Sequence, residues 1–145
     1  MSHRPLPRRL LAACLLLLLL HAAPLLAREA GPIHQLRVYE IFDGTRQAFH
    51  DRFRDHAARI MARHGFHIVS IWESRAEDGT PRFVYLLQWP DEATMRTRWA
   101  AFMADEEWSR IKRETGREHG RFVGGIEEHV LLPTDYSPQA AFRRD

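Results

Sequence analysis

Apolar residues change their spacing along the chain in a fixed order, and this order restricts the possible folds. Residues 33–42 alternate apolar and polar side chains with a period of two, which is typical of a strand with one buried face. Residues 45–64 carry apolar side chains at three- and four-residue spacing, which predicts a helix capped by Thr45. This stripe consists of Phe49, Phe53, Ala57, Ile60 and Met61. Gly65 stands where the residue after a helix needs a positive φ, which glycine tolerates.

The chain continues with a hairpin, a second helix and a last strand. Residues 66–74 and 82–89 are rich in β-branched and aromatic side chains, and the short turn between them predicts an antiparallel pair. Asp91 is placed to cap a helix whose inner face holds Met95, Trp99, Phe102 and Met103. Asp105 is placed to start a further helical turn that carries Trp108 and Ile111. Residues 116–125 predict a loop, with Gly124 and Gly125 in a turn, and residues 125–132 predict the final strand.

This order predicts an α+β, ferredoxin-like βαββαβ fold with a four-stranded antiparallel sheet and helices on one face. The other face of the sheet would carry Phe, Trp and Tyr side chains, and large exposed apolar patches usually mark interfaces. A second copy of the chain could cover it, which predicts a homodimer in the form of a dimeric α/β barrel. Periodicity alone leaves open which face packs on the helices. It does predict that Phe66, Ile68, Ser70 and Trp72 share a face of their strand.

The N-terminal residues 1–27 read as a signal peptide. Leu10 to Leu20 contains eleven uncharged residues and follows Arg4, Arg8 and Arg9, which matches a basic region before an apolar one. Ala27 is the best cleavage residue, and residues 28–32 form a short linker. We therefore expect a periplasmic or secreted protein. An uncleaved membrane anchor stays open as the alternative, because the apolar segment approaches the ~18 residues that span a bilayer.

The charge of the mature chain argues against nucleic acid as a partner. The full chain has 21 basic and 19 acidic residues, and three of the basic ones lie in the leader. Cleavage would leave eighteen against nineteen, so no basic field remains to attract a polyanion. Cys14 is the single cysteine and also lies in the leader, so a mature chain would have neither a disulfide nor a thiolate nucleophile.

Four short segments carry recognisable motifs in a fixed order: the run from Gln35 to Tyr39, Arg63-His64-Gly65 at the end of the first helix, Asp105-Glu106-Glu107-Trp108, and the segment from Leu132 to Pro138. The first two are similar to the start of a NIPSNAP domain, and the last two resemble later motifs of that family. The resemblance covers residues 33–138 and leaves 139–145 as a tail. It implies a dimeric α/β barrel and does not imply a particular reaction.

Residues on three strands and one helix form the candidate ligand site. Arg37 and Tyr39 share one side of the first strand with Gln35, because residues two apart in a strand point the same way. A guanidinium and a phenol there could hold a small anionic or carbonyl-bearing molecule. The other candidate residues are His56, Trp72 and Tyr85. The alternative assigns Arg37 to an ion pair and Tyr39 to the dimer interface.

The histidines and glycines form no recognisable metal or cofactor site. None of the mature chain's histidines has a helical partner three or four residues away, and no phosphate-binding glycine loop is present, so we expect neither metal nor cofactor. Three functions stay open. The chain could bind a small apolar or anionic organic molecule, act as a cofactor-independent monooxygenase or isomerase-like enzyme, or serve as a non-catalytic interaction module.

Overall fold

The computed structural model describes residues 31–143. The expected leader, and with it the alternative of a membrane anchor, lies outside these residues. Among the described residues, no helix is long and apolar enough to cross a membrane.

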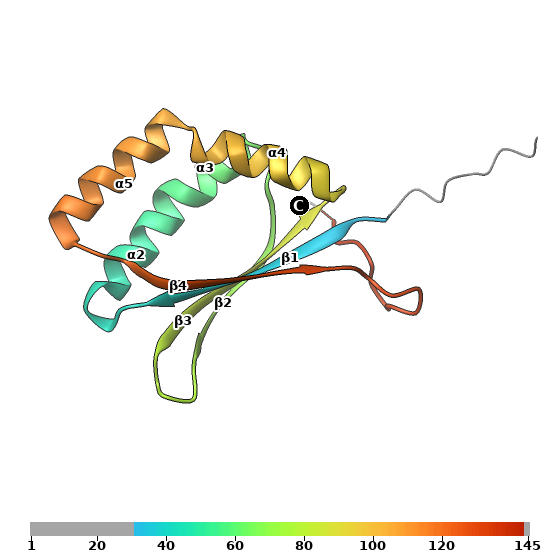
Figure 1. Cartoon of the computed structure of the whole chain (residues 1–145), viewed down its shortest axis with the longest axis horizontal. Helices are drawn as coiled ribbons and strands as arrows, with labels where there is room; N and C mark the ends of the chain where they lie inside the picture. The colour runs from blue at the N-terminus through green and yellow to red at the C-terminus, as the bar shows by residue number, and fades with distance from the viewer. Residues whose placement is uncertain (1–30, 144–145) are drawn as a thin grey trace, which may run out of the picture.

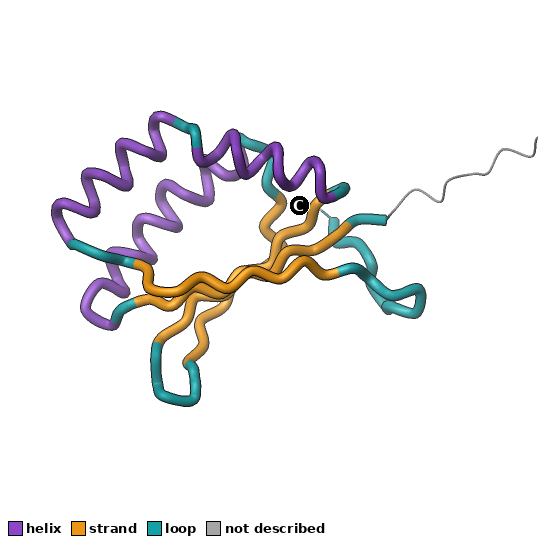
Figure 2. The backbone as a smooth tube through the Cα atoms, in the orientation of Figure 1, coloured by secondary structure: helices purple, strands orange, loops and turns teal. Residues whose placement is uncertain are grey.

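The elements follow the predicted order around one four-stranded sheet. The strands are β1 (Ile33–Ile41), β2 (His67–Arg75), β3 (Pro81–Trp89) and β4 (Val123–Leu131). The helical segments are η1 (Asp43–Thr45), α2 (Arg46–Arg52), η2 (Phe53–Ala57), α3 (Ala58–Arg63), α4 (Glu92–Met103) and α5 (Glu106–His119). All three strand pairs are antiparallel, in the order β2-β3-β1-β4. The helices lie together on one side of the sheet (Figures 1 and 2), which confirms the α+β ferredoxin-like prediction.

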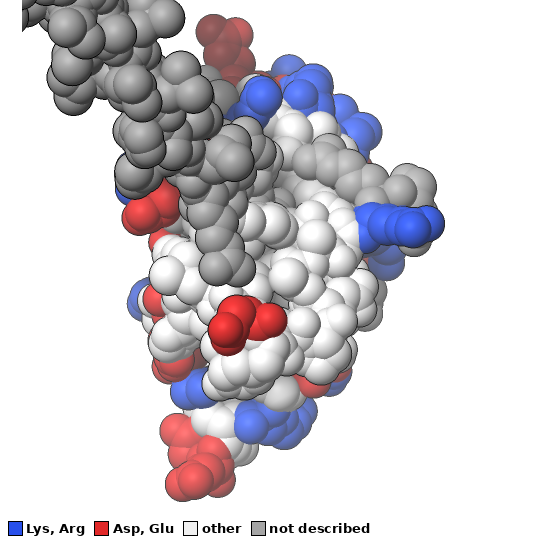
Figure 3. All heavy atoms as spheres, turned by 90° about the vertical axis from the view of Figure 1, so that its right-hand side faces the viewer, with Lys and Arg blue, Asp and Glu red and all other residues white. Residues whose placement is uncertain are grey.

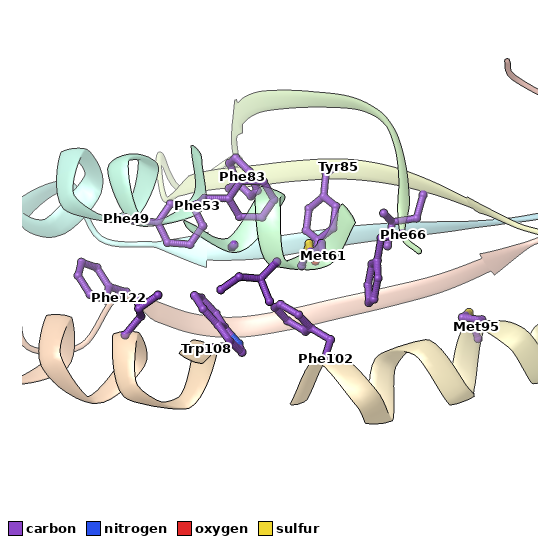
Figure 4. Close-up of a cluster of buried hydrophobic side chains, with 14 of the residues drawn as sticks. Phe49, Phe53, Met61, Phe66, Phe83, Tyr85, Met95, Phe102, Trp108 and Phe122 are labelled. Carbon is purple, nitrogen blue, oxygen red and sulfur yellow. The ribbon is translucent and has the colours of Figure 1, made fainter. Parts of the chain in front are cut away.

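Strand β3 shows which face of the sheet packs on the helices. Its residues alternate strictly between buried and half-buried along the whole strand. The buried set includes Phe83, Tyr85, Leu87 and Trp89, each at most 2% exposed. These side chains meet aromatic residues of the helices, as Figure 4 shows for Phe53 beside Phe83. The core therefore lies between the sheet and the helices.

A bulge in β2 changes which of its side chains share a face of the sheet. Ile68 pairs with Leu87, but Ser70 pairs with Leu86, so one extra residue stands between these two pairs. One extra residue shifts the alternation, so the residues beyond it point to the side opposite to the one a regular strand would give. Trp72 consequently pairs with the outward-facing Val84. The prediction that Ile68, Ser70 and Trp72 share one face is therefore wrong.

The first predicted helix contains a wider turn in its middle. Residues Phe53–Ala57 form a π-helical turn between α2 and α3. An α-helix rotates about 100° per residue, so a stripe repeating every four residues drifts by about 40° at each step. The wider turn compensates for this drift, and Phe49, Phe53, Ala57 and Met61 all stay buried.

Two local predictions were wrong, and a third was right only in part. Thr45 occupies the N-cap position of α2, as predicted, but its side chain makes no capping hydrogen bond; its hydroxyl donates to the carbonyl oxygen of Arg121, 3.3 Å away. Helix α5 extends to His119, so the loop predicted for residues 116–125 begins only after this residue. Gly124 and Gly125 belong to β4, where they make room for the carboxylate of Glu40, which accepts a 2.9 Å hydrogen bond from the amide of Gly125.

Candidate functional site

A cavity of about 570 Å³ lies between the helices and the β1–β4 side of the sheet. It lies within one chain, on the helix face of the sheet, rather than on the face that a barrel of two sheets would enclose. Ten of its lining side chains are apolar or aromatic: Phe49, Phe53, Met61, Met95, Trp99, Phe102, Met103, Trp108, Val123 and Ile126. Five more are charged: Arg37, Arg52, Arg96, Lys112 and Glu128.

Three side chains from β1 and β3 form a hydrogen-bonded chain at one end of this cavity. The Nη2 of Arg37 donates to the hydroxyl of Tyr39 at 3.2 Å, and this hydroxyl lies 2.8 Å from that of Tyr85. The register explains the meeting, because Arg37 pairs directly with Tyr85 on the same face of the sheet. Burial raises the pKa of the Tyr85 phenol well above its ordinary value, and the neighbouring Tyr39 adds to this effect. Tyr85 is therefore a neutral hydrogen-bonding group behind Tyr39.

Arg37 is held from two sides. Its Nη1 forms an ion pair with Glu128 on β4, and its guanidinium carbon lies 4.6 Å from the ring centre of Trp99 on α4. The side chain of Arg37 is only 12% exposed, whereas that of Glu128 is 43% exposed. The ion pair supports the alternative that Arg37 serves a carboxylate of the chain itself. Its position in the cavity wall equally allows it to face a ligand.

Gln35 sits behind the cavity wall and connects two tryptophans. Its Oε1 accepts hydrogen bonds from the indole nitrogens of Trp99, at 2.7 Å, and Trp89, at 3.1 Å. Gln35 is fully buried. Since Trp99 belongs to α4 and Gln35 to β1, this amide fixes the helix over the sheet and the indole against Arg37.

Arg52 and Lys112 are charged wall residues that sequence reasoning missed. Arg52 ends α2 and Lys112 belongs to α5, and both lie near the ring of Trp108, at 5.6 and 5.7 Å. Arg52 also lies 4.1 Å from the ring centre of Phe122. The available signal was the position of Arg52, three residues after Phe49 and therefore on the border of the apolar stripe.

Four of the six predicted site residues come together. Arg37 and Tyr39 line the cavity, while Gln35 and Tyr85 lie fully buried behind them. Trp72 lies on the opposite face of the sheet and is 47% exposed. His56 is half-buried within the π-turn and does not line the cavity. Within residues 31–143, no three His, Cys, Asp or Glu side chains are grouped to hold a metal ion.

Comparisons with known proteins give one family and several similar structures. The family model of NIPSNAP matches residues 34–138. An uncharacterised NIPSNAP-like domain protein from Burkholderia xenovorans is 18% identical, with a TM-score of 0.64, over 77% of this chain and 93% of its own. A NIPSNAP family protein of unknown function from Agrobacterium tumefaciens is 19% identical, with a TM-score of 0.62, over 75% and 94%. At these identities the structures show a common fold.

A looser likeness is to SnoaB, a cofactor-independent oxygenase from Streptomyces nogalater. It is 17% identical, with a TM-score of 0.48, over 76% of this chain and all of its own. This similarity is too low to bear on chemistry. None of the curated proteins matches the sequence.

Proposed function

The chain belongs to the NIPSNAP family, and we propose that it binds a small, largely apolar organic molecule in the cavity between its helices and its sheet. The observation that carries the proposal is the cavity itself. Its volume of about 570 Å³ falls within the ~300–1,000 Å³ of small-molecule sites. Such sites combine mostly apolar walls with a few polar groups that fix orientation, and here Arg37 and Tyr39 supply the polar end.

The cavity also argues against a purely structural module. The space is open to solvent at Met103 and Ile126, which are both exposed, and its walls are mostly apolar. An apolar surface hollowed in this way is typical of a binding groove and favours an occupant. The hydroxyl of Tyr39 can donate to or accept from a carbonyl or hydroxyl group of that molecule.

The test uses a neutral fluorescent probe, N-phenyl-1-naphthylamine, and a variant that fills the cavity. Ile126 lines the cavity, whereas Val130 shares its face of β4 but does not line it. We expect Ile126→Trp to abolish saturable binding of the probe and Val130→Trp to leave it unchanged. Equal binding by both variants, or no saturable binding by the wild type, would reject the proposal.

A second candidate function is catalysis of proton transfer on the bound molecule. It is favoured by the contact of Tyr39 with both Arg37 and Tyr85, because a hydrogen-bonded chain that reaches the cavity through the Tyr39 hydroxyl can pass a proton to or from a bound molecule. A cofactor-independent monooxygenase or isomerase would need such a group. Oxygen uptake with electron-rich phenols, lost in Tyr39→Phe, would support it. No uptake across the pH range, with the cavity saturated, would count against it.

We also propose that the protein is exported and acts as a homodimer. The outward face of the sheet supports the homodimer, because it carries apolar side chains that point away from the helices. These are Leu36, Val38, Val84 and Leu86. Figure 3 views the molecule from the right-hand side of Figure 1, and the middle of that surface is largely uncharged. Leu132 and Tyr136, which follow β4, are exposed.

One native mass spectrum of protein made with its leader tests these proposals together. We expect a mature mass shorter by residues 1–27, two subunits per particle and additional mass from a retained molecule. An uncleaved chain would refute cleavage of this leader and favour the membrane anchor instead. A monomer would refute the dimer.

A further inference from the structure

We infer that the molecule bound in the cavity is an organic acid whose anionic group is held between Arg52 and Lys112. This inference rests on the proposed binding function and adds the chemical class of the ligand and the place of its charge. It concerns the part of the cavity beside Trp108, apart from the Arg37–Tyr39 end.

Several contacts fix Arg52 in the wall of the cavity. Its guanidinium lies 4.1 Å from the ring centre of Phe122 and 5.6 Å from that of Trp108. Its Nη1 donates to the hydroxyl of Thr115 at 3.2 Å. A guanidinium has five N–H donors, so this single hydrogen bond leaves donors for another acceptor. Lys112, one helical turn from Trp108 along α5, brings an ammonium 5.7 Å from the same ring.

The charge of these two side chains is not balanced within the described part of the chain. Several other arginines, in contrast, form an ion pair with a carboxylate, among them Arg37, Arg54, Arg59 and Arg63. Among residues 31–143, neither Arg52 nor Lys112 has a carboxylate within 4 Å. Burial lowers the pKa of the Arg52 guanidinium from its ordinary value. A partly desolvated cation with no counter-charge is the environment in which an external anion binds favourably.

An aromatic row connects the two polar ends of the cavity. Trp99 contacts Arg37, its ring centre lies 5.8 Å from that of Phe102, and the latter stacks on Trp108 at 5.3 Å. Figure 4 shows Phe102, Trp108 and Phe122 in succession, with Trp108 between the other two. An apolar or aromatic body can lie along this row while its acid group meets Arg52 and Lys112. A carbonyl or hydroxyl at its other end would meet Tyr39.

The experiment compares two probes that differ in one anionic group. Anilinonaphthalene-1-sulfonate has the same ring system as N-phenyl-1-naphthylamine and adds a sulfonate. We expect the wild type to prefer the sulfonate probe. Arg52→Gln and Lys112→Gln should each weaken sulfonate binding about tenfold, the loss typical of one charge-assisted contact, and should leave the neutral probe unaffected.

Two further variants separate charge from packing. Arg52→Lys keeps the charge and should retain part of the preference for the sulfonate. Arg113→Gln removes an exposed charge of α5 next to Lys112 and should have no effect.

The outcomes distinguish the inference from the function on which it rests. Saturable binding of the neutral probe, with equal sulfonate affinity in wild type, Arg52→Gln and Lys112→Gln, would overturn the inference and keep the binding function. A parallel loss of both probes in both variants would overturn it too, because the side chains would then only shape the cavity. Absence of binding of either probe to the wild type would reject both.

Discussion

The indole Nε1 of Trp99 lies 2.7 Å from the Oε1 of Gln35 and donates a hydrogen bond to it, which joins α4 to the central strand β1. The same oxygen accepts from Trp89. This arrangement places the plane of Trp99 against Arg37 and thereby forms one wall of the cavity. Gln35 is therefore a positioning residue that lies out of reach of the ligand.

Replacing Gln35 with Leu should destabilise the protein by about 2 kcal/mol, because the buried indole N–H of Trp89 and the part-buried one of Trp99 lose their acceptor. Part of the cost is offset, since the Nε2 of Gln35 has no partner among the described residues and is removed as well. Urea unfolding measures the change. Trp99→Phe provides the second arm of a double-mutant cycle, and additive effects of the two substitutions would show that the hydrogen bond contributes nothing.

Two glycines should respond to alanine in opposite directions. Gly65 follows α3 with φ of +79°, and a Cβ there would approach the Nε of Arg98 to 3.3 Å. Gly65→Ala should therefore cost about 1 kcal/mol or more. Gly116 lies inside α5 with nothing within 4 Å of an added Cβ, so Gly116→Ala should stabilise by about 0.5–1 kcal/mol. Thermal unfolding of both variants beside the wild type tests the pair. Shifts of the same sign would contradict the argument.

The same two glycines show how far the sequence predicts the fold. The positive φ of Gly65 was predicted, because a glycine ends an apolar helical stripe there. At Gly116 the sequence predicts the start of a loop, since propensity disfavours glycine within a helix, but the residue lies inside α5. The order of strands and helices follows from local periodicity alone. The length of α5 depends on tertiary contacts such as the burial of Ile111, which local patterns do not reveal.

The site was predictable where its residues share one strand. A period of two places Arg37 and Tyr39 on a common face, whichever face that is. Trp72 could not be placed, because no residue type marks the bulge that turns it outward. Arg52 and Lys112 meet at Trp108 only through the packing of α2 and α5 beside the sheet. Such a meeting depends on the relative position of two helices, about which neither helix sequence is informative.

Stability should fall in acid because of a carboxylate cluster between α3 and α5. Asp105 accepts hydrogen bonds from His64 and Arg63, both at 2.7 Å, and from the amide of Trp108. The hydrogen bond from His64 contributes most to holding the pKa of Asp105 far below its ordinary 3.8. Hydrogen bonds from Arg59 and Arg63 lower the pKa of Glu107 from 4.5 to about 2.

Since both carboxylates have a lower pKa in the folded state, their stabilisation is complete above about pH 5 and is lost as the pH falls toward about 2. Asp105→Asn keeps a side chain that can cap α5 but has no charge to titrate. Its free energy of unfolding in urea should therefore decline less steeply between pH 5 and pH 2 than that of the wild type. Parallel declines would show that Asp105 does not carry the acid sensitivity.

Glu128 should oppose the binding of anions near Arg37. It pairs with Arg37 in the cavity wall and thereby cancels the charge that a ligand would otherwise meet. Glu128→Gln leaves the guanidinium without this counter-charge. The Arg37 end then offers the sulfonate a second cationic site, so we expect sulfonate-probe affinity in the Arg52→Gln background to rise severalfold, with the neutral probe unchanged. Arg37 is largely buried, so moderate salt should reduce this gain only in part. Glu127→Gln is the control, because Glu127 pairs with Val38 on the outward face of the sheet. An equal rise in both variants would indicate a general change of net charge and remove Glu128 from the account of the site.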